Sequence, residues 1–262
     1  KQTTAYEIMP RLVGSEMCIR DRLRLIVTSS TYRQSSRMTR RQWLQDPHNR
    51  LLARASRFRL PAELIRDGAL AAGGLLVERI GGPSVKPYQP PGLWKETSNR
   101  PYVQDSGAAL YRRSLYTYWK RSVPPPNLFA LDAPTRETCI TRRQRTNTPL
   151  MALVLMNDPT FVEAARGLAV RTMLRDAVDD VARVEWLFVA VTARRPDPQE
   201  LETMVRLIAD QRTRFRGRPQ AARELLSVGQ SPLDKRVDVV EQAAWTALAS
   251  VLLNTDEAIT RE

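Results

Sequence analysis

Apolar residues recur at helical spacing through the second half of the chain. Three residue pairs that end in proline mark helix starts there, namely Thr148-Pro149, Asp158-Pro159 and Asp197-Pro198. The Thr or Asp side chain can cap the first turn, and proline at the first helical position lacks only an N–H group that would have no helical partner. Glu200 adds a capping box to the third start. The pattern therefore predicts a helix after each pair.

Two further helices are predicted from apolar content. Apolar residues at helical spacing from 181 to 191 indicate one of them. A nearly all-apolar stretch over residues 239–253 indicates the other. Because such a stretch has no polar face, we expect this last helix in the core.

The first half of the chain carries weaker helical patterns. A short helix is predicted from residue 23 to about residue 36. The pair Asp46-Pro47 predicts a second helix start. Pro61 predicts a third helix, which weakens at the glycine pair 73–74 and stops at Gly81-Gly82-Pro83.

Other parts of the first half do not have a helical pattern. Residues 83–101 contain five prolines and predict an irregular loop that Tyr88 and Trp94 anchor. Residues 111–121 alternate in polarity and are rich in aromatic side chains, which favours a strand. The predicted fold class is mainly α: a helical C-terminal half, and an N-terminal half of helices plus a Pro-rich, Arg/aromatic irregular region with one or two short strands.

Charge distinguishes the two halves. The 262 residues include 41 Lys or Arg and 28 Asp or Glu, for a net charge of +13, and 36 of the 41 cations are arginines. Residues 23–150 carry 22 cations and 8 anions, whereas residues 151–262 carry 15 cations and 17 anions. An arginine guanidinium pairs bidentately with carboxylate, phosphate or sulfate, although a GC-rich coding bias produces the same composition. The basic character belongs to the first half.

Composition excludes several classes of site. Two cysteines exclude a disulfide scaffold and a four-thiolate metal site, and one histidine excludes a His-rich metal site. The sequence has no haem-attachment motif, P-loop, dinucleotide-binding glycine motif or zinc-ligand spacing. No run of about 18 apolar residues occurs, so we expect no membrane span.

The N-terminal segment differs from the rest. Residues 6–22 read YEIMPRLVGSEMCIRDR and have neither the regions of a signal peptide nor a regular apolar period. They resemble a sequencing adapter translated as coding sequence. We therefore expect residues 1–22 to be non-native, and residues 23–262 to be a single incomplete domain, truncated at its N-terminus, with a basic irregular part over 23–150 and a helical part over 151–262.

The densest group of polar side chains predicts a ligand-binding region between residues 111 and 147. Arginine forks beside aromatic faces suit an anionic or polyhydroxylated ligand, because the forks pair with oxyanions and the rings stack on flat surfaces. The alternative is that these arginines hold an irregular segment together through carbonyl and carboxylate hydrogen bonds. The candidate ligand-binding residues are Arg112, Arg113, Tyr116, Trp119, Lys120, Arg121, Asp132, Arg136, Glu137, Arg142, Arg143, Arg145 and Asn147.

Catalytic chemistry is also conceivable in this region. Nearby cations favour the thiolate of Cys139, but a nucleophilic cysteine usually needs a histidine base, and only His48 exists. A buried structural role for Cys139 is the alternative. Acid pairs drawn from Asp105, Asp132 and Glu137 could serve glycoside hydrolysis, although most proteins of this length offer such pairs.

Several segments resemble one family. They include LIVTSSTYRQSS at 25–36, GGPSVKPYQPPGLW at 81–94, FALDAPTRETCITRRQRTNTPLMALVLMNDPTFVEAAR at 129–166 and SVLLNTDEAITRE at 250–262. These segments are similar to the C-terminal domain of unknown function of large planctomycete proteins, planctomycete-specific domain one. The resemblance runs from about residue 24 to residue 262.

The resemblance implies a cellular location and neighbouring domains that composition alone does not indicate. Relatives are exported proteins with an upstream cytochrome-c-like segment, so haem c is expected upstream and no cofactor is expected in this chain. No enzymatic activity is established for this family domain, so the resemblance assigns no catalytic residue and leaves open whether the chain is an enzyme. It also implies a domain that begins earlier, with a further helical segment, and ends as this chain ends.

Three functions follow as hypotheses. The favoured one is a binding or accessory module for an anionic partner such as polysaccharide, or for upstream domains of the same chain. The first alternative is a hydrolase or redox unit that uses Asp132, Glu137 and Cys139. The second alternative is a basic nucleic-acid-binding module, but no nucleic-acid-binding motif is recognisable.

Overall fold

Helices make up most of the regular structure in the computed structural model, as the apolar pattern predicts. The structure describes residues 16–95, 101–176 and 179–261. Over these residues the fold class is mainly α, and the two short strands β1 (Phe58–Arg59) and β2 (Thr260–Arg261) pair with each other. The chain forms two compact units, one up to residue 58 together with 261–262, and the other from 59 to 260. Each is described by itself below.

The smaller unit holds the helices α2 (Glu16–Thr28) and α3 (Arg40–Gln45). The helix predicted from residue 23 to about residue 36 thus begins earlier and ends earlier. It ends in a run of hydroxyl side chains that bond to the backbone: Thr28 donates to the Arg24 carbonyl at 2.6 Å, and Ser29 donates to the Ile26 carbonyl at 2.8 Å. Such local bonds compete with helical ones and so favour a helix end.

The prediction of a helix start at Asp46-Pro47 is wrong. Helix α3 instead ends there, and Asp46 follows its last residue. The Asp46 carboxylate accepts the backbone N–H groups of Arg50 at 2.8 Å and Leu51 at 2.7 Å, and these hydrogen bonds lower its pKa. The Asp side chain therefore stabilises a turn, which is the other common use of an Asp-Pro pair.

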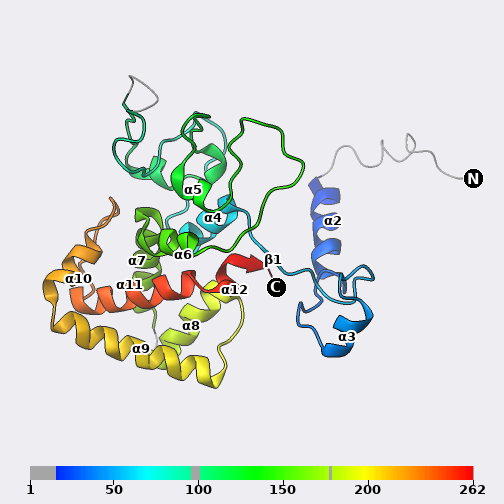
Figure 1. Ribbon diagram of the computed structural model, residues 1–262. Coiled ribbons are helices and arrows are strands. Elements are labelled where there is room, and N and C mark those ends of the chain that lie inside the picture. Colours follow the sequence, from blue (N-terminus) through cyan, green and yellow to red (C-terminus); the bar gives the residue numbers. More distant parts are fainter. Residues whose placement is uncertain (1–15, 96–100, 177–178, 262) are drawn as a thin grey trace, which may run out of the picture. The chain divides into compact units, whose positions relative to one another are not determined.

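The larger unit is a set of helices packed around α11. In Figure 1 α11 lies between α7 and α9, and it packs against both and against α10. The α-helices of this unit are α4 (Ala62–Ala72), α5 (Pro126–Ala130), α6 (Pro149–Asn157), α7 (Pro159–Met173), α8 (Asp180–Thr192), α9 (Pro198–Arg216), α10 (Pro219–Leu226), α11 (Val239–Leu253) and α12 (Asp256–Ile259).

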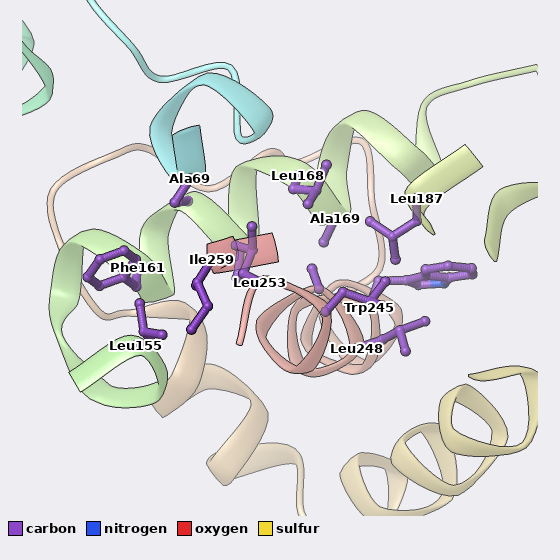
Figure 2. Close-up of a cluster of buried hydrophobic side chains, with 14 of the residues drawn as sticks. Ala69, Leu155, Phe161, Leu168, Ala169, Leu187, Trp245, Leu248, Leu253 and Ile259 are labelled. Carbon is purple, nitrogen blue, oxygen red and sulfur yellow. The ribbon is translucent and has the colours of Figure 1, made fainter. Parts of the chain in front are cut away.

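The predicted core position of residues 239–253 is confirmed. Trp245 and Leu248 of α11 are fully buried, and they meet Leu168 of α7 and Leu187 of α8 in one apolar cluster (Figure 2). Burial of each such side chain contributes about 1.5–3 kcal/mol, so this cluster is the main apolar contribution to stability.

The three predicted proline-marked helix starts are confirmed. Asp158 accepts the Thr160 backbone N–H at 2.9 Å at the start of α7. At the start of α9, Asp197 accepts the N–H of Glu200 at 2.8 Å, while the Glu200 carboxylate accepts the N–H of Asp197 at 2.7 Å. Thr148 caps α6 by accepting the N–H of Met151.

The strand predicted for residues 111–121 is wrong. The segment forms two 3-10 turns, η1 (Gly107–Tyr111) and η2 (Ser114–Tyr116), and its pairing with other segments is limited to isolated bridges. The reason is Arg66 of α4, whose side chain is 1% exposed. Its guanidinium donates to the carbonyls of Leu110 at 2.8 Å and Arg112 at 3.0 Å, and to the Ser114 hydroxyl at 3.2 Å. Three acceptors within five residues converge on one group, which an extended strand cannot provide.

A second buried polar network lies on α7. Glu163 is fully buried, and one carboxylate oxygen accepts the Tyr111 hydroxyl at 3.0 Å and the Ser231 N–H at 2.6 Å. Arg166, one turn later, lies 3.4 Å from the same oxygen. The Arg166 guanidinium also donates to the carbonyls of residues 226, 228 and 231, which lie at the end of α10 and in its connection to α11. This network attaches two irregular segments to the helical core.

Helix α4 ends at Ala72, before the stop predicted at Gly81-Gly82-Pro83, and it approaches α7 through glycine. A Cβ built on Gly167 of α7 would lie 2.4 Å from the carbonyl oxygen of Gly73, at the end of α4. A Cβ built on Gly73 would lie 2.6 Å from the Ala164 carbonyl oxygen. Since backbone atoms on both sides form this contact, no side-chain rotation can make room.

We expect Gly167→Ala to lower the free energy of unfolding by about 1–3 kcal/mol, because the new methyl group must push the two helices apart. Gly68→Ala is the matched control, because Gly68 lies on α4 and a methyl group added there would meet no atom within 4 Å. It is expected to raise stability by up to about 1 kcal/mol through helix propensity. Urea unfolding measures both. Equal effects of the two substitutions would contradict the close helix contact.

Candidate anion-binding loop

The arginine loop, residues 132–146, is closed at its base by one carboxylate. Asp132 accepts the backbone N–H of Thr146 at 2.6 Å and the Thr146 hydroxyl at 2.8 Å. Asp132 follows the short helix α5 and has a φ of 61°, the left-handed conformation that commonly ends a helix. Helix α5 and Thr146 together therefore fix both ends of the loop.

Arg59 supports this base from the inside. Its buried guanidinium donates to Asp132 at 2.7 Å and to the Leu131 carbonyl at 3.2 Å. Burial lowers the pKa of Arg59, the Asp132 carboxylate opposes that shift, and the positive charge of Arg145 adds to it. Asp132 is thus the counter-ion of a buried arginine as well as the hydrogen-bond acceptor that closes the loop.

A small pocket of about 270 Å³ lies between this base and the returning part of the loop. Arg143 at its edge pairs with Glu63 of α4 at 2.8 Å while its side chain stays 44% exposed. Arg142 is exposed and makes no ion pair or hydrogen bond among the described residues. The pocket is lined by Arg59, Pro61, Leu131, Asp132, Thr141, Arg142, Arg143, Gln144 and Arg145. Four guanidinium groups line it with one carboxylate, a charge that is complementary to an anion.

A second basic pocket involves the same loop. It has a volume of about 450 Å³ and is lined by Lys120, Arg121, Ser122 and Glu137. Beside it in sequence, Arg136 lies 4.3 Å from the ring centre of Trp119, whose indole N–H donates to the Thr135 carbonyl at 2.9 Å. The ammonium group of Lys120 lies 4.5 Å from the ring centre of Trp94. Cations are thus held over aromatic faces here.

Two other predicted binding residues, Arg112 and Tyr116, form hydrogen bonds with backbone groups of the segment 79–83. The guanidinium of Arg112 donates to the carbonyls of Arg79, Gly81 and Pro83, and it stacks 3.9 Å from the ring centre of Tyr116. The Tyr116 hydroxyl accepts the N–H of Gly81 at 2.8 Å. These two residues shape the segment 79–83. Arg113 and Asn147 are exposed and line neither of the two pockets.

The residues of the enzyme alternative belong to different surroundings. Asp132 and Glu137 line different pockets, and Cys139 is an exposed free thiol rather than a buried one. His48 lies in the smaller unit. The carboxylate of Asp105 accepts the backbone N–H of Lys86 at 2.7 Å, which is a structural contact. Among the described residues no group of three or more His, Cys, Asp or Glu could hold a metal ion.

Two residues that contact the arginine loop were not among the predicted site residues. Arg59 and Glu63 lie 73 and 80 positions before Asp132 and Arg143, the partners that they bind. Nothing local in the sequence links these positions. The one indication in the sequence is that the loop has more arginines than acidic residues, so its arginines need acidic partners from other segments.

The larger unit is thus a mainly α domain whose irregular region contains a basic loop. Within the described part of the chain, no helix is long and apolar enough to cross a membrane. The chain belongs to the PSD1 family, proteins of unknown function (DUF1553), whose family model matches residues 8–208. The resemblance of the sequence to this domain of unknown function is thereby confirmed. No curated protein and no solved structure shows significant similarity to the chain.

We expect Asp132→Asn to lower the free energy of unfolding by about 2–4 kcal/mol, because Arg59 would remain buried without its counter-ion. Glu63→Gln is the control. It removes the partly exposed pair with Arg143, and it is expected to cost no more than about 1 kcal/mol. Urea unfolding of both variants measures the difference. If Asp132→Asn costs no more than Glu63→Gln, Asp132 does not organise the base of the loop.

Proposed function

We propose that this domain is a binding module whose arginine loop holds an anionic partner such as a sulfated or uronic polysaccharide. The observation that carries the proposal is the pocket at the loop base, where arginines 142, 143 and 145 surround a single space and Arg59 lies behind it. A guanidinium group offers two parallel N–H donors, which match the paired oxygens of sulfate or carboxylate.

A polymer fits the loop better than a small ion does. The two basic pockets both take residues from the arginine loop, one at positions 141–145 and the other at Glu137. Thr141, Gln144 and Ser122 add neutral hydrogen-bonding groups beside the cations. Repeating acidic groups separated by hydroxyl-bearing rings offer partners for both kinds of side chain.

The setting of the domain belongs to the same proposal. We infer from the family resemblance that the domain acts in an exported, planctomycete-type protein in which an upstream segment carries haem c. Covalent haem attachment uses a Cys-x-x-Cys-His motif, which this sequence does not contain. The proposal therefore assigns no residue of this chain to haem, and the proposed binding needs none.

We expect the double substitution Arg142→Ala/Arg143→Ala to weaken binding to dextran sulfate and to polygalacturonate by at least about tenfold, because two charge-assisted contacts are lost. The control is Arg206→Ala/Arg214→Ala, which removes two exposed arginines of α9 and so the same net charge. It should change affinity by less than about twofold, apart from long-range screening effects. Affinity electrophoresis or calorimetry measures the dissociation constants.

Two results would contradict this proposal. One is equal weakening by the loop pair and the α9 pair, which would make the binding a matter of net charge alone. The other is stronger binding to a DNA duplex than to either polysaccharide, with a steep salt dependence, which would favour the nucleic-acid alternative. Uncharged dextran should not bind to any variant.

A further inference from the structure

The first turn of α4 and the residues just before it hold the arginine loop through two ion pairs of opposite polarity. Arg59 donates to Asp132 at the start of the loop, whereas Glu63, four residues after Arg59, accepts from Arg143 near the end of the loop. Pro61 lies between them and lines the pocket at the loop base together with Arg59. This short stretch of chain therefore lines the pocket and holds a charged side chain at each end of the loop.

Glu63 is fixed in place by the helix that carries it. It lies in the first turn of α4, where the helix dipole favours a negative charge. Its neighbours Ala62 and Ile65 are buried in the core, so this turn cannot shift without disturbing that packing. The Glu63 side chain is 21% exposed and does not line the pocket. Its carboxylate is thus a fixed acceptor beside the anion site and not a group inside it.

Glu63 uses only one nitrogen atom of Arg143. Both carboxylate oxygens accept from Nη1, at 3.0 Å and 2.8 Å. The Nε and Nη2 atoms of Arg143 form no hydrogen bond among the described residues, and the side chain is 44% exposed. Nε and Nη2 form one edge of a guanidinium, with two parallel N–H donors that match the paired oxygens of a carboxylate or a sulfate. The ion pair therefore leaves this bidentate edge of Arg143 available to a ligand.

We infer that Glu63 is a positioning residue for the anion site: it holds the Arg143 side chain at the edge of the pocket with the bidentate edge free for the oxyanion of the ligand. This inference rests on the proposed function of the arginine loop. An arginine side chain loses rotamer freedom when it binds a ligand. Because Glu63 has already ordered Arg143, less freedom is lost when the anion arrives. Arg142, which has no ion pair among the described residues, is ordered only by the ligand itself.

The negative charge of Glu63 acts in the opposite direction. Electrostatic repulsion alone predicts that removal of a carboxylate beside the pocket strengthens the binding of an anion. At about 0.15 M salt the Debye length is about 8 Å, which weakens this repulsion. Salt does not change the rotamer freedom that Arg143 loses, so the ordering of Arg143 outweighs the repulsion under these conditions. Removal of Glu63 should therefore weaken anion binding, although it makes the chain more positive.

The test compares variants of the full chain by calorimetric titration with dextran sulfate and with polygalacturonate at about 0.15 M salt. We expect Glu63→Ala to weaken binding about threefold to tenfold, because Arg143 is then ordered only on binding. Glu63→Gln should stay within about twofold of the wild type, because the amide oxygen still accepts from Nη1. Asp234→Ala is the matched control, since it removes the 19% exposed partner of Arg236, changes the net charge equally and lines neither basic pocket. It should not weaken binding.

Two further measurements show whether Glu63 acts through Arg143. In a double-mutant cycle, Glu63→Ala should no longer weaken binding once it is combined with Arg143→Ala. Nitrogen-15 relaxation of the Arg143 Nε–H group needs no ligand, and it should show an ordered side chain in the wild type and in Glu63→Gln and a mobile one in Glu63→Ala. Circular dichroism of each variant confirms that it is folded before its affinity is compared.

Several results would overturn the inference. Tighter binding by Glu63→Ala than by the wild type would show that the carboxylate competes with the ligand for Arg143. Equal mobility of Arg143 with and without Glu63, or equal weakening by Glu63→Ala with and without Arg143, would also overturn it. These results leave the proposed function intact. Failure of the proposed function is a different result, in which the wild type binds neither polysaccharide or Arg142→Ala/Arg143→Ala leaves its affinity unchanged, and that result overturns both.

Discussion

The buried carboxylate of Glu163 is the contact on which the irregular parts of the larger unit depend. It lies on a core helix, yet its partners, Tyr111 and Ser231, come from a 3-10 turn and from the connection between α10 and α11. Arg166 balances its charge and donates to three carbonyls at the end of α10 and in that connection. Segments without helical or ladder hydrogen bonds need other partners for their backbone groups, and this ion pair provides them. Removing one member would leave the other buried and unpaired, so the pair has to be kept as a unit.

Buried arginines satisfy backbone carbonyls in the same way in the first half of the larger unit. The guanidinium groups of Arg59, Arg66 and Arg112 are buried, and each donates to main-chain carbonyls of a distant segment. A guanidinium has five N–H donors in a fixed plane, so one side chain can satisfy carbonyls that a sheet would otherwise satisfy. Part of the arginine excess is therefore structural. The arginines of the loop at positions 142, 143 and 145, in contrast, are exposed.

Most features that depend on neighbours in sequence could be predicted, although the pair Asp46-Pro47 forms a turn and starts no helix. Features that depend on distant partners could not be predicted. The caps at Thr148, Asp158 and Asp197 act within one helical turn, and each was predictable from a residue pair. The alternating pattern at 111–121 favoured a strand, because nothing nearby shows that Arg66 draws three acceptors of that segment together. Likewise the arginine loop was recognisable from its composition, but its support by Arg59 was not.

The division between structural and exposed arginines bears on how the loop could bind. Its base is rigid, because Asp132 is shared between the buried Arg59 and the returning Thr146. Arg142, in contrast, has no ion pair or hydrogen bond among the described residues, and Arg143 has one partly exposed partner. An arriving anion therefore does not have to displace the carboxylate that holds the loop in place. A rigid base reduces the conformational entropy lost on binding, while the exposed guanidinium groups keep their charge available.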